Sequence, residues 1–187
     1  MAKLGVFNMT SLDGCIADRN GDMSWAHRDP HDAEWNAFTS ENASGGGVLV
    51  FGRVTYDLMV RWWPTPQAAQ TMPVVAERMN ALQKIVFSRS MTVASWQNTR
   101  LVTGDLVAEM RRLKQGPGPD MVILGSGSIV GQLAEAGLID DYQIAVVPVV
   151  LGRGKTMFEA VTHNLALKLT GSRVFGNGTV VLRYQPA

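Results

Sequence analysis

The sequence has one cysteine, Cys15, and no long run of apolar residues. A single thiol cannot form an internal disulfide, and without a CxxC pair we expect no bound metal. No apolar stretch reaches the length of about 18 residues that a transmembrane helix needs. The first residues also lack a charged leader followed by an apolar segment. We therefore expect a cytoplasmic protein that does not insert into membranes.

An excess of charge of one sign is also missing. The 187 residues include 17 Lys and Arg and 16 Asp and Glu, which gives a formal net charge of +1, and no basic block occurs. This balance does not favour nucleic acid as a partner. The H-x-E and P-C-x-x-C pattern of zinc deaminases is absent too. Hydrophobic residues make up 46%, which is enough for one domain over residues 1–187.

Apolar runs and helical patterns alternate along most of the chain. Strands are predicted at residues 4–9, 48–51, 84–87, 101–102 and 121–124, and β-rich segments at 139–151, 165–175 and 179–185. Helices are predicted from a start at Asp29-Pro30 to about residue 43, over 53–60 and 105–115, and from the 125–128 turn to Gly137. Two prolines predict a loop at 62–66.

These elements predict a three-layer α/β fold. Alternating strands and helices favour a mainly parallel, twisted sheet with helices on both faces. The turn at 176–178, Gly-Asn-Gly, joins the last two β segments, which predicts an antiparallel C-terminal hairpin.

A glycine- and serine-rich turn follows the predicted strand at 121–124. It consists of Gly125, Ser126, Gly127, Ser128 and Ile129. Glycines permit a sharp turn and a close ligand approach, and the start of the next helix offers unpaired N–H groups and a partial positive charge. The pattern favours an anion site suited to a pyrophosphate. A tight turn without a ligand is the alternative.

Two common nucleotide-binding motifs do not apply here. The glycines at 125, 127 and 131 are spaced G-x-G-x-x-x-G rather than G-x-G-x-x-G, and Ala145 stands where an acid would bind a ribose. Segment 152–156, Gly-Arg-Gly-Lys-Thr, ends like a nucleoside-triphosphate loop. Val149 occupies the position of that loop's first glycine, so the motif is rejected.

Five separated segments match one family pattern in order. Segment 11–17 is similar to S-x-D-G-x-I-A, 50–56 to a strand followed by G-R-x-T-[YW], and 151–158 to L-G-x-G-x-x-x-F. Segments 85–90 and 123–130 match two further strand ends. Together they resemble the dihydrofolate reductase superfamily, and most of all the reductase domain of the bifunctional riboflavin-biosynthesis deaminase–reductase and its stand-alone relatives. The resemblance runs from about Leu4 to Tyr184.

The resemblance implies a reductase that binds NADPH across the carboxyl ends of its strands. The nicotinamide is expected near Ile16 and Ala17, and the phosphates at the turn 125–129. The remaining expected contacts are Gly52, Arg53, Thr55, Ser88, Arg89 and Ser90. An arginine between two serines, with no acid nearby, favours a 2′-phosphate and hence NADPH over NADH. A surface arginine at 53 and a plain polar turn at 88–90 are the alternatives.

Asp32 is the candidate catalytic residue. It lies in a segment that resembles the one in which dihydrofolate reductases carry their substrate carboxylate, but an acid that stabilises a helix start is the alternative. The resemblance implies a small heterocyclic or ribosylaminopyrimidine substrate, as for 5-amino-6-(5-phosphoribosylamino)uracil reductase. A dihydropterin, another small carbonyl or imine, and a non-catalytic nucleotide-binding role are the alternatives. The relatives also imply a homodimer, for which segment 139–151 is the candidate interface.

Overall fold

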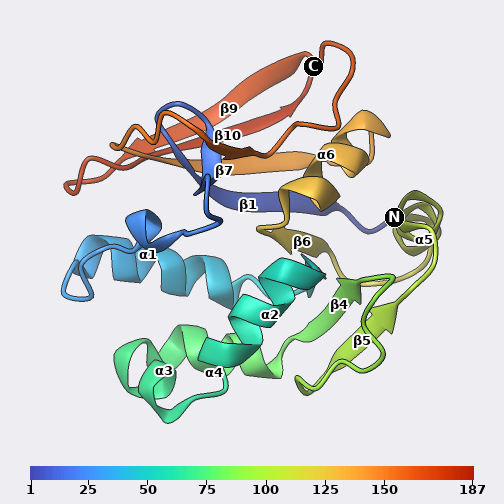
Figure 1. The fold of residues 1–187 in the computed structure, drawn as a ribbon, viewed down its shortest axis with the longest axis horizontal. Helices are drawn as coiled ribbons and strands as arrows, with labels where there is room; N and C mark the ends of the chain where they lie inside the picture. The colour runs from blue at the N-terminus through green and yellow to red at the C-terminus, as the bar shows by residue number, and fades with distance from the viewer.

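The computed structural model describes residues 1–187 and contains one large sheet (Figure 1). Its strands are β1 (Leu4–Ser11), β3 (Val48–Gly52), β4 (Gln83–Phe87), β5 (Thr99–Val102), β6 (Met121–Leu124), β7 (Asp141–Val147), β9 (Leu167–Val174) and β10 (Val180–Pro186). They lie in the order β5-β4-β3-β6-β1-β7-β10-β9. The pairings from β5 to β7 are parallel, whereas β10 pairs antiparallel with β7 and β9. The predicted fold class is confirmed.

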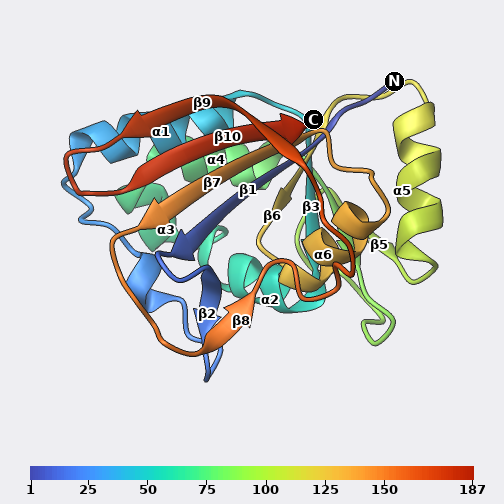
Figure 2. The same cartoon turned by 90° about the horizontal axis from the view of Figure 1, so that it is seen from above.

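Helices cover both faces of this sheet (Figures 1 and 2). They are α1 (Ala33–Ser44), α2 (Arg53–Trp62), α3 (Pro66–Thr71), α4 (Pro73–Ala81), α5 (Leu106–Gln115), α6 (Gly127–Glu135) and the short 3-10 helix η1 (Ser24–Ala26). On one face, Val130 and Leu133 of α6 pack with Val50 of β3. On the other, Tyr56 of α2 packs with Phe51. Because both faces are covered, all five residues of β3 are buried.

A small second sheet lies beyond the carboxyl end of β1 (Figure 2). It pairs β2 (Cys15–Asp18) antiparallel with β8 (Gly154–Thr156). We call this unit the β2–β8 ribbon. The sequence did not predict either strand, because both are too short to show an alternating pattern.

Several predicted boundaries are wrong. The first helix begins at Ala33 rather than at Pro30, because the carboxylate of Asp32 accepts a hydrogen bond from the backbone N–H of Trp35 at 3.0 Å and caps the helix. The segment predicted as a loop at 62–66 instead contains the last residue of α2 and the first residue of α3. Proline fits the first turn of a helix, where no N–H is needed, and Pro66 and Pro73 each begin one. The sequence therefore missed α3 and α4.

The β-rich segment predicted at 139–151 contains β7, which ends at Val147. Within the sheet, β7 lies between β1 and β10, so both of its edges are already paired. The edge strand at this end of the sheet is β9, and Leu169 and Val174 on it are exposed. No helix has the length and apolarity needed to cross a membrane.

The exposed face of α5 carries a small charge network. Arg100 and Arg112 both donate to the carboxylate of Glu109, at 2.8 Å each, and these hydrogen bonds, chiefly that of Arg112, lower the pKa of Glu109 to about 2. Because the pKa falls below the ordinary 4.5 on folding, the carboxylate stabilises the fold fully above pH 4.5 and loses this effect as the pH falls toward 2.

Replacing Glu109 with glutamine is therefore expected to lower the free energy of unfolding by about 1 kcal/mol at neutral pH, since both arginines are solvent-exposed. Urea unfolding at neutral pH and at about pH 2.5 measures the effect. The difference in free energy of unfolding between wild type and variant should be smaller at the lower pH. Glu77→Gln, on an exposed glutamate of α4, is the control and should change little. A deficit of Glu109→Gln that does not depend on pH would contradict the prediction.

Candidate functional site

The predicted cofactor segments all lie at one edge of the sheet. Ser88 follows β4, Gly52 ends β3 and Gly125 follows β6. Since these strands are parallel neighbours, in the order β4-β3-β6-β1, their carboxyl ends meet at the same edge. Three segments that are far apart in the sequence therefore come together as expected, while their contacts with a cofactor stay predictions.

Two helix N-termini are joined at this edge by one hydroxyl group. Gly52 caps α2 and Ser126 caps α6. The hydroxyl of Ser126 accepts a hydrogen bond from the backbone N–H of Gly52 at 2.7 Å and donates to Oγ1 of Thr55 at 2.8 Å. The first amides of each helix, such as those of Gly127 and Ser128 in α6, have no acceptor within their helices and form the positive end of each helix dipole. The pair of helix starts is therefore well suited to bind one large anion.

The glycines of the turn have no room for a side chain. A Cβ at Gly125 would lie 2.8 Å from Cγ2 of Thr55, and Gly125 has a φ of +68°. A Cβ at Gly127 would lie 2.7 Å from Cδ1 of Ile16 and 2.8 Å from the carbonyl oxygen of Thr156. The turn therefore packs directly against α2 on one side and against the β2–β8 ribbon on the other. This places Ile16 next to the start of α6.

Asp13 fastens the β2–β8 ribbon to the main sheet. Its Oδ1 accepts from the hydroxyl of Ser11 at 2.6 Å and from the backbone N–H of Leu151 at 3.1 Å, and its Oδ2 accepts from the N–H of Gly152 at 2.7 Å. The Ser11 bond, followed by the Leu151 bond, lowers the pKa of Asp13. The S-L-D-G and L-G-R-G segments, which the sequence showed as separate motifs, are thus in direct contact through the carboxylate of Asp13.

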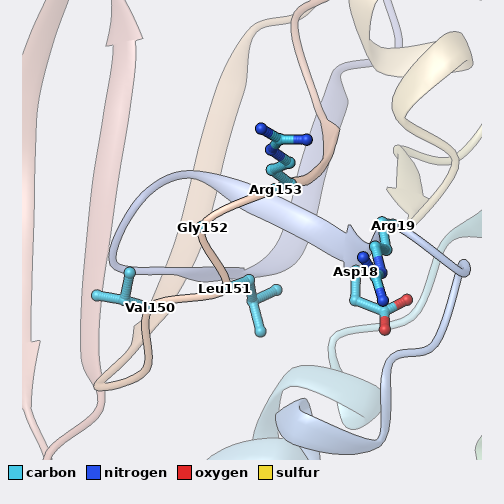
Figure 3. A pocket seen from close by; sticks show the side chains of 6 residues that line it. All are labelled: Asp18, Arg19, Val150, Leu151, Gly152 and Arg153. Carbon is cyan, nitrogen blue, oxygen red and sulfur yellow. The ribbon is translucent and has the colours of Figure 1, made fainter.

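A groove lies at the open end of the ribbon, one residue beyond Ala17 (Figure 3). It encloses about 470 Å³ and is lined by Asp18, Arg19, Val150, Leu151, Gly152 and Arg153. Asp18 accepts from the backbone N–H groups of Asn20 and Asp22, at 2.8 Å each, and so closes its own turn. Neither Arg19 nor Arg153 forms an ion pair. The groove is therefore lined by two arginines without ion pairs and by one carboxylate, that of Asp18, which the sequence had not indicated.

The two arginines predicted to bind phosphate are also free. Arg53, in the first turn of α2, and Arg89, after β4, are both exposed, and neither is ion-paired. The hydroxyl of Ser88 accepts from the N–H groups of Ser90 at 3.2 Å and Met91 at 3.0 Å. These bonds hold the turn around Arg89 without using its guanidinium, which remains available to an anion.

Asp32 has partners at both carboxylate oxygens. Oδ1 accepts from Trp35 N at 3.0 Å, and Oδ2 accepts from Nδ2 of Asn177, in the turn between β9 and β10, at 2.7 Å. The hydrogen bond from Trp35, followed by that from Asn177, lowers the pKa of Asp32. The side chain is therefore ionised at neutral pH and caps a helix. A catalytic role for it stays a prediction.

Sequence reasoning missed Asn8, which contacts the same turn. This side chain is buried in β1, and its Oδ1 accepts from the backbone N–H of Gly125 at 2.6 Å. The only signal in the sequence was an amide side chain within the otherwise apolar run 4–9. Nothing local indicated which backbone group it bonds, because the two residues are 117 positions apart.

Solved structures with the same architecture align with the whole chain. A structure from Shewanella sp. PV-4, named as a candidate riboflavin biosynthesis protein, aligns with a TM-score of 0.77 and 25% identity over 100% of this chain and 99% of that one. The deaminase/5-amino-6-(5-phosphoribosylamino)uracil reductase of Thermotoga maritima aligns with a TM-score of 0.66 over all of this chain and 57% of its own. Its identity is 15%, so this similarity shows the fold alone.

Sequence comparisons agree with this result. The uncharacterized protein YyaP of Bacillus subtilis (strain 168) is 29% identical over 174 residues, which are 93% of this chain and 89% of that protein. YwjB of the same organism is 28% identical over 183 residues, 97% of each chain. Residues 2–181 match the family described as the RibD C-terminal domain. The chain therefore belongs to the RibD C-terminal domain family, and its structural relatives are riboflavin-biosynthesis reductase-like proteins.

Proposed function

We propose that this chain is an NADPH-dependent reductase of a ribosylaminopyrimidine that carries a phosphate group. The observation that carries the proposal is the pair of helix starts that Ser126 joins at the carboxyl ends of β3 and β6. Family membership supports a reductase, and the remaining details rest on the chemistry of the site.

The donor set fits a dinucleotide with a pyrophosphate. The first-turn amides of α2 and α6 would bind the two phosphates, with Arg53 beside them. Gly125 and Gly127 let this turn pack closely against Thr55 and Ile16, which brings the starts of α2 and α6 together. Arg89 would bind a 2′-phosphate at the end of β4, two strands away from β6 in the sheet. This order of strand ends matches the order of groups along an extended NADPH molecule.

When bound, NADPH supplies the hydride, and the protein supplies orientation and a dry pocket. Ile16, which packs against Gly127, would lie against the nicotinamide and exclude water from that side. Asp32 is the proposed catalytic residue. Because its pKa is lowered, Asp32 is ionised at neutral pH, so it would accept a hydrogen bond from a substrate N–H rather than deliver a proton.

The groove beside Ala17 is the proposed seat of the substrate phosphate. Arg19 and Arg153 have no carboxylate partners, and each guanidinium offers a fork of donors suited to a phosphate. A homodimer, which the relatives imply, stays a prediction. The exposed edge strand β9 is a better candidate interface than β7, whose edges are both paired.

The test begins with a titration of purified protein with NADPH, followed by its fluorescence. We expect binding at sub-millimolar cofactor, and loss of the reduced-nicotinamide absorbance with a phosphorylated ribosylaminopyrimidine. Arg19→Ala and Arg153→Ala should each raise the KM for this substrate by about tenfold and leave that of the dephosphorylated compound unchanged. Arg111→Ala, on an exposed arginine of α5, is the control.

Other outcomes separate the alternatives. No binding of NADPH would contradict the reductase. Oxidation only with a dihydropterin or with a small carbonyl compound would assign the other substrate classes. Binding without oxidation by any substrate of the panel would favour the non-catalytic nucleotide-binding protein.

A further inference from the structure

Asn8 is a polar side chain in the apolar core next to the proposed site. It lies on β1, between β6 and β7, and is 5% exposed. Leu4 and Val6 precede it on the same side of the strand and belong to the main core. Burial of a carboxamide is unfavourable unless both of its ends form hydrogen bonds. The partners of Asn8 therefore indicate why an amide stands at this position.

Both ends of the Asn8 amide have partners. Oδ1 accepts from the backbone N–H of Gly125 at 2.6 Å, and Nδ2 donates to Sδ of Met157 at 2.9 Å. A backbone N–H can only donate, so the oxygen must face Gly125 and the amide group has one orientation. Met157 directly follows β8. Asn8 therefore links the turn after β6 to the end of the β2–β8 ribbon.

The turn that Asn8 holds has an unfavourable backbone. Gly125 has a φ of +68°, and Ser126, which is not a glycine, has a φ of +59°. A left-handed conformation at a residue with a side chain persists only when its surroundings impose it. Two contacts do so here: Asn8 binds the N–H of Gly125, and the hydroxyl of Ser126 binds the N–H of Gly52.

The contact with Asn8 also decides which amides face a ligand. It engages the N–H of Gly125 inside the protein, so this group is not directed at an anion. The N–H groups of Gly127 and Ser128, in the first turn of α6, remain without an intrahelical acceptor. Their direction depends on the conformation of the two preceding residues, which Asn8 and the Ser126 hydroxyl restrain.

We propose that Asn8 is a positioning residue for the pyrophosphate of the cofactor. It sets the direction of the α6 amides without touching the cofactor, by fixing the N–H of Gly125. This inference rests on the proposed function, because it needs a pyrophosphate at the joined helix starts. It predicts an effect on cofactor affinity that is separate from any effect on stability.

The test compares Asn8→Ala with Val6→Ala, a buried truncation on the same side of β1 at a residue that pairs with Ile123, before the turn. Both variants are expected to lower Tm. Only Asn8→Ala should weaken NADPH binding, by about tenfold, at a temperature where both proteins are folded. Reduced nicotinamide mononucleotide, which lacks the pyrophosphate, should bind both variants as it binds the wild type.

A second variant covers the case in which Asn8→Ala does not fold. Met157→Leu keeps nearly the same volume but removes the acceptor of Nδ2, so Asn8 is held at one end only. We expect its Kd for NADPH to rise by about threefold and its affinity for the mononucleotide to stay unchanged. The amide of Gly125 should exchange slowly with solvent in the free wild type, and faster in both variants.

The outcomes distinguish this inference from the proposed function. If the wild type does not bind NADPH, both are wrong. If the wild type binds NADPH and the variants bind it equally well despite faster exchange at Gly125, the positioning role is overturned and the reductase proposal stands. If NADPH and the mononucleotide weaken to the same extent, Asn8 supports the fold generally and not the pyrophosphate turn.

Discussion

Replacing Gly125 with aspartate is expected to abolish measurable NADPH binding, with a rise in Kd of at least about 100-fold. A Cβ at this position would lie 2.8 Å from Cγ2 and 2.9 Å from Oγ1 of Thr55, so Thr55 or the turn must move. The new carboxylate would also lie at the positive end of α6, where it would compete with a phosphate. Steric and electrostatic effects therefore act in the same direction.

Gly137 offers a matched control for this substitution. It has a φ of +65°, close to the +68° of Gly125, and a Cβ there would have no neighbour within 4 Å. Gly137→Asp thus has the same backbone strain and the same charge, far from the proposed phosphate seat. It should lower stability and leave the Kd for NADPH unchanged. Retained affinity in Gly125→Asp would show that the phosphates do not bind at this turn.

Comparing Gly125→Ala with Gly125→Asp separates the steric effect of the new side chain from the electrostatic effect of its charge. Alanine adds the Cβ without the charge, so its effect reports the displacement of Thr55 together with the backbone strain. We expect a loss of about tenfold for alanine and a further loss for aspartate that decreases as salt is added.

The inner strands β3 and β4 were predictable because nearly all of their residues are buried. Each has a neighbouring strand on both sides and helices on both faces of the sheet, so each reads as a short apolar run. The positions of α3 and α4 were not predictable in the same way. The pattern at 62–66 was interpreted as a proline-bounded loop, although Thr65 caps α3 and Pro66 begins it. A proline alone does not show whether a helix stops or starts there.

The candidate site was predictable only in its outline. Glycine motifs after buried strands located Gly52 and Gly125, since parallel strands bring such motifs to one edge. The hydrogen bonds between them could not be predicted, because they depend on side chains meeting across the fold. Ser126 shows this well: its sequence context suggests a donor to a ligand, whereas its hydroxyl proton goes to Thr55. At the 125–129 turn, the donors left over are therefore mostly backbone amides.

Replacing Arg89 with alanine is expected to remove the preference for NADPH over NADH. Arg89 follows β4, is exposed and has no ion pair, so its guanidinium is available to a 2′-phosphate. The turn that carries it is closed by the Ser88 hydroxyl, and the variant should fold as the wild type does. Loss of one charge-assisted contact should lower kcat/KM for NADPH by about 10- to 100-fold and leave that for NADH within about twofold.

Arg53→Ala is the informative comparison for this prediction. Arg53 lies at the start of α2, beside the proposed seat of the pyrophosphate that NADPH and NADH share, so its loss should weaken both cofactors to a similar extent. Steady-state kinetics with the two cofactors, at low and high salt, measures the difference. The specific loss in Arg89→Ala should diminish at high salt, because the contact is solvent-exposed. Equal losses for both cofactors in Arg89→Ala would place Arg89 at the shared phosphates and leave the 2′-phosphate without a ligand at β4.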